Sequence, residues 1–391
     1  MITREKNKIL YYAGWNSFTH IGGAYNLARS MPDVEFHVVS AEKWPFRKLD
    51  NVVFHKLIRP NCAMRIDEKF FLHTYPYEKD LGDLDKYRKH LFEYLKLLRK
   101  IQPNLVVVDI TLEIAIWSKF LGYPVALFYE TIDSDNLRHH LAWNNVDSIL
   151  VRYPKHFVAT IEPNLHSKMF FSGGVSKFDS MEIATNRERN FEVTGAVKDK
   201  RKIVTVLSSS HSHNNAQVRK YFETICEALD GESEKIQCFM LYPENDKLAE
   251  RLKEQYKNIN FVIGVFNKVQ HYLAISDLVI TGAGMGATME SAYFRAPMLI
   301  IPVPWIIKEQ ALKANGLESI GAAKVVNPAG MTPQDITSKM YEMLGNKDLL
   351  QNMKDNERKL IDKNGYKRLA SHINRMLKSS KCQNKISVIR D

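Results

Sequence analysis

Cysteine is scarce in this chain of 391 residues. The four cysteines, Cys62, Cys226, Cys238 and Cys382, are scattered, and no CxxC pair or histidine cluster accompanies them. Disulfide frameworks and structural zinc sites need such pairs or clusters, so the sequence argues against both. We therefore expect a protein of a reducing compartment that holds no metal.

Long hydrophobic runs are also missing. The chain starts with the polar residues MITREKNK, and the apolar run ILYYAG that follows is too short for a signal peptide or a membrane span. We expect a cytoplasmic protein, with a place at the membrane surface left open.

Acidic residues are outnumbered by basic ones. The 55 Lys and Arg against 44 Asp and Glu give a formal net charge of +11. Such an excess favours polyanionic partners, namely nucleic acid, anionic lipid headgroups or phosphorylated small molecules. A Lys-rich solubilising surface is an equally good explanation, because the basic residues are mixed with acids along the chain.

Short apolar runs rich in β-branched residues alternate with stretches of helical period. This alternation is typical of parallel sheets covered by helices. A chain of this length divides into about two domains, so the predicted class is α/β, with two facing Rossmann-like domains and a cleft between them. The expected strands are residues 8–14, 34–40, 51–57, 105–109, 124–130, 148–152, 156–160, 203–210, 236–243, 259–264, 269–276, 277–281 and 298–304.

A polar and charged stretch separates the two halves. Residues 176–202 have no apolar period apart from a brief FEV, which is typical of an interdomain connection. We predict a first domain at residues 1–178, a linker at 179–200, a second domain at 201–365, and a C-terminal helix and tail at 366–391.

Three glycines lie within five positions between a predicted strand and a predicted helix, in the segment TGAGMGATMESAYFRA at residues 281–296. Glycine lets a ligand approach the main chain closely, and the start of a helix attracts phosphate. Glu290, about one turn into the helix, can accept hydrogen bonds from both hydroxyls of a ribose. The pattern predicts a nucleoside diphosphate site. A tightly packed turn, with Glu290 as a helix-dipole partner, would have the same sequence pattern and is the alternative.

The segment at residues 278–326 resembles the nucleotide-binding half of the GT-B glycosyltransferases. It is most similar to the UDP-sugar transferase branch that includes the UDP-GlcNAc transferase of peptidoglycan lipid synthesis. The shared pattern is a glycine turn, a helix carrying Glu, a strand ending in Pro and a final helix and turn. Its members here are Gly284, Glu290, Ala296, Pro297, Pro302, Gln310, Ala314, Leu317, Glu318, Gly321, Ala322 and Ala323.

The resemblance implies a role for each part of this segment. Glu290 would bind the ribose, and Glu309 and Gln310 the hydroxyls of the donor sugar. Lys313 stands where family members often have Asn, which leaves the donor sugar open. The diphosphate would lie on Gly284, Met285, Gly286, Ala287 and Thr288, with Ser209 in place of a family glycine, and the base near Phe266.

A second, shorter match lies in the first half. THIGGAYNLARSM fits the pattern of a histidine, a Pro or Gly three residues later, then Leu-Ala and a hydrophobic residue. By resemblance, His20 would be the general base that deprotonates the acceptor, which suits an imidazole. A histidine that only caps the helix is the alternative. Glu130 alone stands near the position of the family's acceptor motif.

One tripeptide points to a different fold. Asp133-Ser134-Asp135 is a DxD motif, which in GT-A enzymes holds Mn²⁺ or Mg²⁺. The start of a following helix, with Ser134 or Asp135 as its cap, explains these residues better. We therefore expect no metal and no cofactor, the nucleotide sugar being a substrate.

The sequence thus predicts a glycosyltransferase that moves a sugar, most simply UDP-linked, to an acceptor hydroxyl by metal-independent inverting transfer. The acceptor is left open among lipid-linked, small-molecule and nucleic-acid compounds, and so is the oligomeric state. Three alternatives share the nucleotide pocket: a UDP-GlcNAc 2-epimerase-like enzyme, a DNA glycosyltransferase and a non-catalytic nucleotide-sugar-binding subunit.

Overall fold

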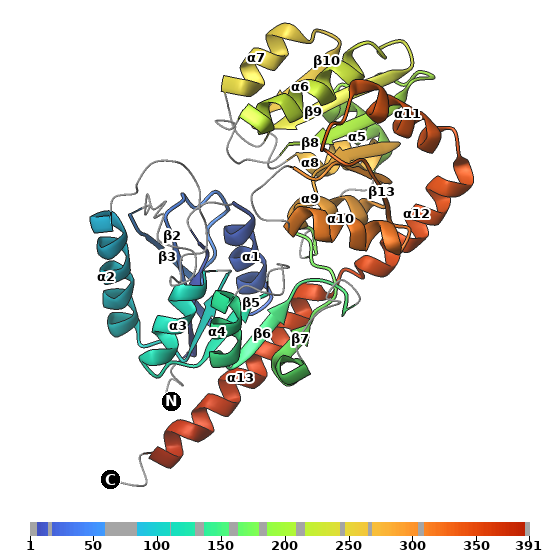
Figure 1. The fold of residues 1–391 in the computed structure, drawn as a ribbon. Coiled ribbons are helices and arrows are strands. Elements are labelled where there is room, and N and C mark those ends of the chain that lie inside the picture. The colour runs from blue at the N-terminus through green and yellow to red at the C-terminus, as the bar shows by residue number, and fades with distance from the viewer. Residues whose placement is uncertain are drawn as a thin grey trace. The chain divides into compact units, whose positions relative to one another are not determined.

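The chain forms two compact units, Met1–Gly173 with Asn364–Asp391, and Gly174–Lys363 (Figure 1). The computed structural model describes residues 6–14, 18–58, 84–109, 111–129, 137–155, 163–179, 186–208, 216–242, 247–264, 268–303 and 309–387. Each unit contains a sheet of parallel strands with helices beside it. The predicted α/β class with two parallel sheets is confirmed.

The sheet of the first unit has the strand order β3-β2-β1-β4-β5-β6-β7. Its described strands are β1 (Lys8–Tyr12), β2 (Glu35–Ser40), β3 (Val52–Lys56), β4 (Leu105–Val108), β5 (Val125–Phe128), β6 (Ser148–Val151) and β7 (Met169–Phe171). β4, β5 and β6 are buried at every position, as expected when helices cover both faces of a parallel sheet. The strand order reverses between β1 and β4, which pair in parallel.

The helices of the first unit come from both ends of the chain. They are α1 (Phe18–Arg29), α2 (Leu84–Ile101), α3 (Leu112–Phe120), α4 (Leu137–Asn145), the 3₁₀ helix η2 (Pro163–Lys168) and α13 (Gly365–Ser387). α13 belongs to this unit because it packs against β7 and the residues that follow it. The His372 ring stacks on Phe170, and Arg368 Nε donates to the Ser172 carbonyl at 2.6 Å. β7 is the edge strand on the side of α13, and the strand expected at residues 156–160 lies outside the described residues.

The second unit repeats the plan with the order β10-β9-β8-β11-β12-β13. The strands are β8 (Lys202–Leu207), β9 (Ile236–Tyr242), β10 (Ile259–Ile263), β11 (Leu278–Thr281), β12 (Met298–Ile300) and β13 (Ala323–Val325). The helices are α5 (Arg187–Thr194), α6 (Ala216–Asp230), α7 (Lys247–Gln255), α8 (Val269–Ile275), α9 (Met285–Phe294), α10 (Glu309–Ser319), α11 (Pro333–Leu344) and α12 (Lys347–Leu360). Here the order reverses between β8 and β11.

Residues 269–275 form α8, so the strand predicted at residues 269–276 is wrong. Val269, Tyr272 and Leu273 are buried at spacings of three and four residues, which places them on one face of a helix. The run is too short for its period to distinguish a helix from a strand by sequence alone.

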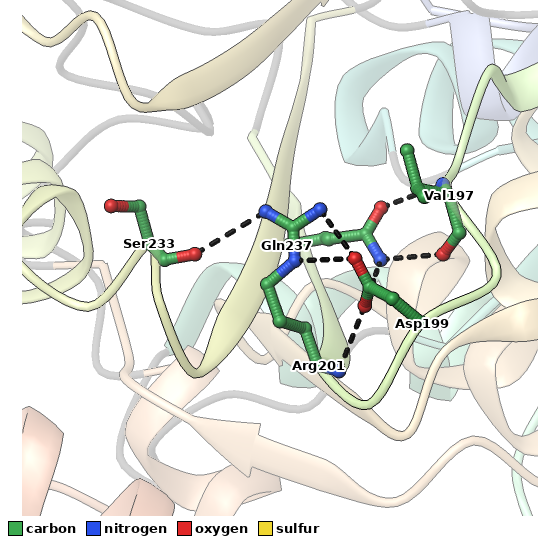
Figure 2. A network of polar contacts seen from close by, with 5 residues as sticks. All are labelled: Val197, Asp199, Arg201, Ser233 and Gln237. Atoms are coloured by element: carbon green, nitrogen blue, oxygen red, sulfur yellow. Dashed lines mark hydrogen bonds and ion pairs between the residues drawn. The ribbon is translucent and has the colours of Figure 1, made fainter.

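The stretch predicted as a linker, residues 179–200, contains α5 and is attached to the second unit. The Asn186 side chain caps the helix, and Gly195 ends it with φ of 68°. Figure 2 shows how the chain after the helix is held. Gln237 of β9 exchanges two hydrogen bonds with the main chain of Val197, at 2.8 and 2.6 Å. Arg201 binds Asp199 and reaches the Ser233 carbonyl at 3.3 Å, so these residues form a fixed entry to β8.

Candidate active site

Each sheet has one point where its strand order reverses, and ligands of open parallel sheets bind beyond the carboxyl ends of the strands there. In the first unit, these ends are those of β1 and β4, which lead to His20 and Asp109. In the second unit, they are those of β8 and β11, and β11 leads into the glycine turn before α9. His20 and the glycine turn therefore follow strands at which a ligand is expected.

Gly284 is the N-cap of α9. Its φ of −64° suits any residue, and a methyl group added to it would meet nothing within 4 Å. Neither the backbone nor the packing therefore explains the glycine, whereas the close approach of a ligand would. The amides of Met285, Gly286 and Ala287 open the helix and have no acceptor within it, which is the arrangement that binds phosphate. The Thr288 hydroxyl donates to the Gly284 carbonyl at 3.0 Å.

Gly282 has a different reason to be glycine. A methyl group there would lie 2.8 Å from Gln310 Oε1 and 2.9 Å from Val303 Cγ2. Gln310 Oε1 in turn accepts a hydrogen bond from the Val303 amide at 3.0 Å. With this bond holding Oε1, the NH₂ group of Gln310 is a donor that can meet a ligand.

Glu290 forms an ion pair with Lys177. The two side chains are 15% and 19% exposed, and Lys177 Nζ lies 3.0 Å from Glu290 Oε2. The ammonium holds the carboxylate of Glu290 in the orientation seen here. Lys177 was not predicted from the sequence, because it precedes Glu290 by more than a hundred residues in a polar stretch.

Four side chains of the first unit, Tyr11, His20, Asp109 and Arg152, form a buried group that we call the Asp109 cluster. Arg152 binds both carboxylate oxygens of Asp109, with Nη1 2.9 Å from Oδ2 and Nη2 2.6 Å from Oδ1. The Tyr11 hydroxyl donates to Oδ2 at 2.9 Å, and His20 Nδ1 lies 3.1 Å from Oδ1. The His20 side chain is 12% exposed, whereas Asp109 is completely buried.

Charge outweighs burial at Asp109. Burial alone would raise its pKa, but the Arg152 guanidinium and His20 hold the pKa of this carboxyl well below its usual range. Burial, with the charge of Asp109, raises the pKa of the Tyr11 phenol. The cluster therefore contains an ionised carboxylate and a neutral phenol at neutral pH.

Two glycines let α1 approach this cluster. A methyl group on Gly23 would lie 3.0 Å from the Tyr11 hydroxyl and 3.4 Å from Arg152 Nη1. Gly14, where the chain leaves β1, has φ of 68°, a conformation that favours glycine. Gly23 belongs to the histidine pattern noted in the sequence, so part of that pattern makes room for the carboxylate.

Asp109 and Arg152 were missed as site residues by the sequence analysis. Each is the last residue of a predicted strand and directly follows an observed one, which was the available signal, because carboxyl ends of parallel strands meet at one edge of a sheet. Lys313 is buried on α10. Ser209, Phe266, Glu130 and the DxD motif at 133–135 lie outside the described residues, and so does the side chain of Glu309, the first residue of α10.

The described residues contain neither a membrane span nor a metal cluster. No helix among them is both long and apolar enough to cross a membrane. No group of three or more His, Cys, Asp or Glu within the same residues could hold a metal ion.

Comparison with known proteins gives a consistent answer. Residues 203–372 match the glycosyltransferase family 28 C-terminal domain. A curated relative from Staphylococcus aureus, the UDP-N-acetylglucosamine--N-acetylmuramyl-(pentapeptide) pyrophosphoryl-undecaprenol N-acetylglucosamine transferase, is 26% identical over 286 residues, 70% of this chain and 74% of that protein.

Two solved structures share the fold over almost the whole chain. The crystal structure of Acinetobacter baumannii MurG aligns with a TM-score of 0.60 at 15% identity, covering 94% of this chain and 99% of that one. The spinosyn forosaminyltransferase SpnP aligns with a TM-score of 0.67 at 12% identity, covering 95% and 100%. The chain is therefore a glycosyltransferase of the GT-B fold that resembles the UDP-sugar transferase branch of the peptidoglycan lipid enzyme, and its residues 203–372 match the family 28 C-terminal domain.

Proposed function

We propose that this glycosyltransferase transfers a sugar from a UDP-linked donor to an acceptor hydroxyl, with inversion and without a metal ion. The observation that carries the proposal is the start of α9, where the space beside Gly284 is open and Glu290 lies further along the same helix. This arrangement offers amides and a helix dipole to a diphosphate, and a carboxylate to a ribose.

The donor is held by the second unit. The diphosphate rests on the first turn of α9, the ribose hydroxyls donate to Glu290, and Gln310 donates through its NH₂ group to the sugar. Lys177 orients the carboxylate of Glu290. Glu309, Ser209 and Phe266 complete the site as the sequence resemblance implies.

The acceptor is activated by His20. With its Nδ1 toward Asp109, the imidazole can keep Nε2 as the basic nitrogen and take the proton of the acceptor hydroxyl. The hydroxyl oxygen then bonds to the anomeric carbon as the bond from that carbon to the diphosphate breaks. The nucleoside diphosphate leaves with the electron pair, stabilised by the amides of α9 and not by a cation.

A lipid-linked acceptor at an anionic membrane is the acceptor class that we favour. The printed name of the Staphylococcus aureus relative describes transfer to an undecaprenol-linked compound. In this chain, α2, α3 and α4 pack side by side and expose large apolar side chains. These are Phe92, Trp117, Phe120, Leu121 and Leu141, with Phe120 73% exposed.

The experiment that tests the donor site is a thermal-shift series with UDP, dTDP, GDP, ADP and duplex DNA in EDTA. UDP should raise the unfolding temperature of the wild type, and Glu290→Ala should lose most of this shift. Glu250→Ala, an exposed glutamate of α7, is the matched control and should keep it.

The products formed from UDP-N-acetylglucosamine then distinguish a transferase from an epimerase. Release of UDP supports transfer, whereas conversion of the donor to its C2 epimer would assign an epimerase. A nucleotide shift that appears only with Mn²⁺, or none for any nucleotide, would overturn the proposal. Binding of nucleotide without turnover of any acceptor would leave a non-catalytic subunit.

A further inference from the structure

The guanidinium of Arg152 is held on both sides. It follows β6, is 3% exposed, and lies over the Phe128 ring of β5 with its Cζ 4.2 Å from the centroid. Its two terminal nitrogens meet the two oxygens of Asp109. A planar fork with this pairing fixes both the position and the plane of the carboxylate, which a single-point charge does not do.

Each oxygen of Asp109 is shared. Oδ2 accepts from Arg152 and Tyr11, and Oδ1 accepts from Arg152 and faces His20 Nδ1. Because Arg152 and Tyr11 fix the carboxylate plane, Oδ1 points toward the imidazole. The orientation of His20 is therefore linked to Arg152 through a residue that both contact.

The titratable groups around the carboxylate come from several elements. They are His20 from α1, Tyr11 from β1, Arg152 after β6, and Tyr366 from α13, which is close enough to perturb both Tyr11 and Arg152. Glu113 of α3 acts on Tyr12, whose side chain leaves β1 on the opposite face from Tyr11. Within this set, Arg152 is the permanent positive charge.

We propose that Arg152 is a positioning residue for the base: it keeps Asp109 ionised and correctly oriented, so that Asp109 holds the proton of His20 on Nδ1 and leaves Nε2 free. This inference rests on the proposed function, in which His20 is the base. Without Arg152, the buried carboxyl of Asp109 favours its protonated form, which no longer presents a negatively charged oxygen to His20 Nδ1, 3.1 Å away. The base then loses its fixed tautomer.

The sign of the pH effect follows from Asp109. In the wild type its pKa is depressed, so the interaction with His20 persists to low pH and is lost only as pH falls through that depressed value. Without Arg152, burial is less opposed and the pKa of Asp109 rises. The rate of the variant should therefore begin to fall at a higher pH than the rate of the wild type as the solution is acidified.

The test uses the full chain labelled with ¹⁵N-histidine, with the His20 signals assigned by comparison with His20→Gln. Wild type should show one neutral tautomer with the proton on Nδ1, and Arg152→Met should show mixed tautomers. The pH profile of UDP release from UDP-N-acetylglucosamine should shift in the same variant. Arg88→Met, an exposed arginine of α2, is the control and should change neither.

Two further variants keep the test decisive if Arg152→Met does not fold. Arg152→Lys retains the positive charge but cannot bind both oxygens of Asp109 as the guanidinium does. The pH at which the rate falls on acidification should therefore stay as in the wild type, while the rate itself should be lower. Gly23→Ala keeps every charge but presses on Tyr11 and Arg152, so it should alter the His20 tautomer.

An unchanged tautomer and an unchanged acidic limb in a folded Arg152 variant would reduce Arg152 to a structural role and overturn the inference. If His20→Gln keeps the full rate while the tautomer still depends on Arg152, the proposed base is wrong and the coupling to Arg152 stands.

Discussion

Two carboxylates, Asp109 and Glu290, take part in the proposed function. Each forms an ion pair with a basic side chain, and the two pairs differ in how deeply they are buried. Asp109 and Arg152 are both almost fully buried, whereas Glu290 and Lys177 are partly exposed. Removing one member of a buried pair typically costs about 3–5 kcal/mol of stability, against about 0–1 kcal/mol at an exposed pair. Changes at Asp109 should thus affect folding as well as rate, while changes at Glu290 should affect mainly ligand binding.

At Gly284 the structure separates a ligand-binding role from a packing role. Gly284→Ala should cost at most about 1 kcal/mol of stability, because Ala is a poor N-cap but meets no neighbour. Its methyl group should occupy the space of the diphosphate and weaken UDP binding by about tenfold, or about 1.4 kcal/mol. Calorimetric titration with UDP and thermal unfolding measure the two effects.

Gly282→Ala is the comparison for this prediction. Its methyl group would press on Gln310 and Val303, so the expected effect is a loss of stability of about 1–3 kcal/mol. Normal UDP affinity in Gly284→Ala would mean that the ligand does not approach the chain there.

At the scale of elements, the strands were predictable because burial on both faces turns them into continuous apolar runs. β4 and β6 are examples. α8 was mistaken for a strand since seven residues do not establish a period, and α5 was missed because it is short, polar and recognisable only from its caps. The glycine turn and His20 lie within local patterns, so they could be selected from sequence.

Asp109, Arg152 and Lys177 could not be selected in that way. Their partners lie 43 residues or more away along the chain, and sheet order and tertiary packing bring them together. The roles of His20 and of the glycine turn were inferred from resemblance, and they remain predictions.

α13 completes the first unit although it follows the second in sequence. Ile373, on its buried face, is 0% exposed. Ile373→Ala should lower the stability of this unit by about 2–5 kcal/mol, since three buried side-chain carbons and their packing are lost. Hydrogen exchange should show reduced protection of the β1 and β4 amides and unchanged protection of β8 and β11.

Ser371→Ala, an exposed position on the same helix, is the matched control and should change stability by less than about 0.5 kcal/mol. Reduced protection confined to residues 174–363 would contradict the assignment of α13 to the first unit.

Across the whole molecule, the positive charge is divided unequally. Residues 174–363 contain 25 Lys and Arg against 24 Asp and Glu, whereas the remaining residues contain 30 against 20. Residues 364–391 alone contain seven basic residues and one acidic residue. The second unit is thus nearly neutral, and the excess belongs to the unit that also exposes the apolar side chains of α2, α3 and α4.

This combination predicts that the first unit binds anionic membranes. The protein should sediment with vesicles containing phosphatidylglycerol and less with neutral vesicles, and the difference should shrink as salt rises because headgroup attraction is screened. Phe120→Ser should weaken partitioning by about tenfold, since burial of one aromatic side chain contributes roughly 1.5–3 kcal/mol.

Leu312→Ser, at an exposed apolar position of the second unit, is the matched control and should bind vesicles like the wild type. An equal loss in both variants would show that the apolar side chains of α2, α3 and α4 have no special role. If duplex DNA is bound more tightly than the vesicles at the same salt concentration, the basic charge serves a nucleic-acid acceptor, and the preference for a lipid-linked acceptor is wrong.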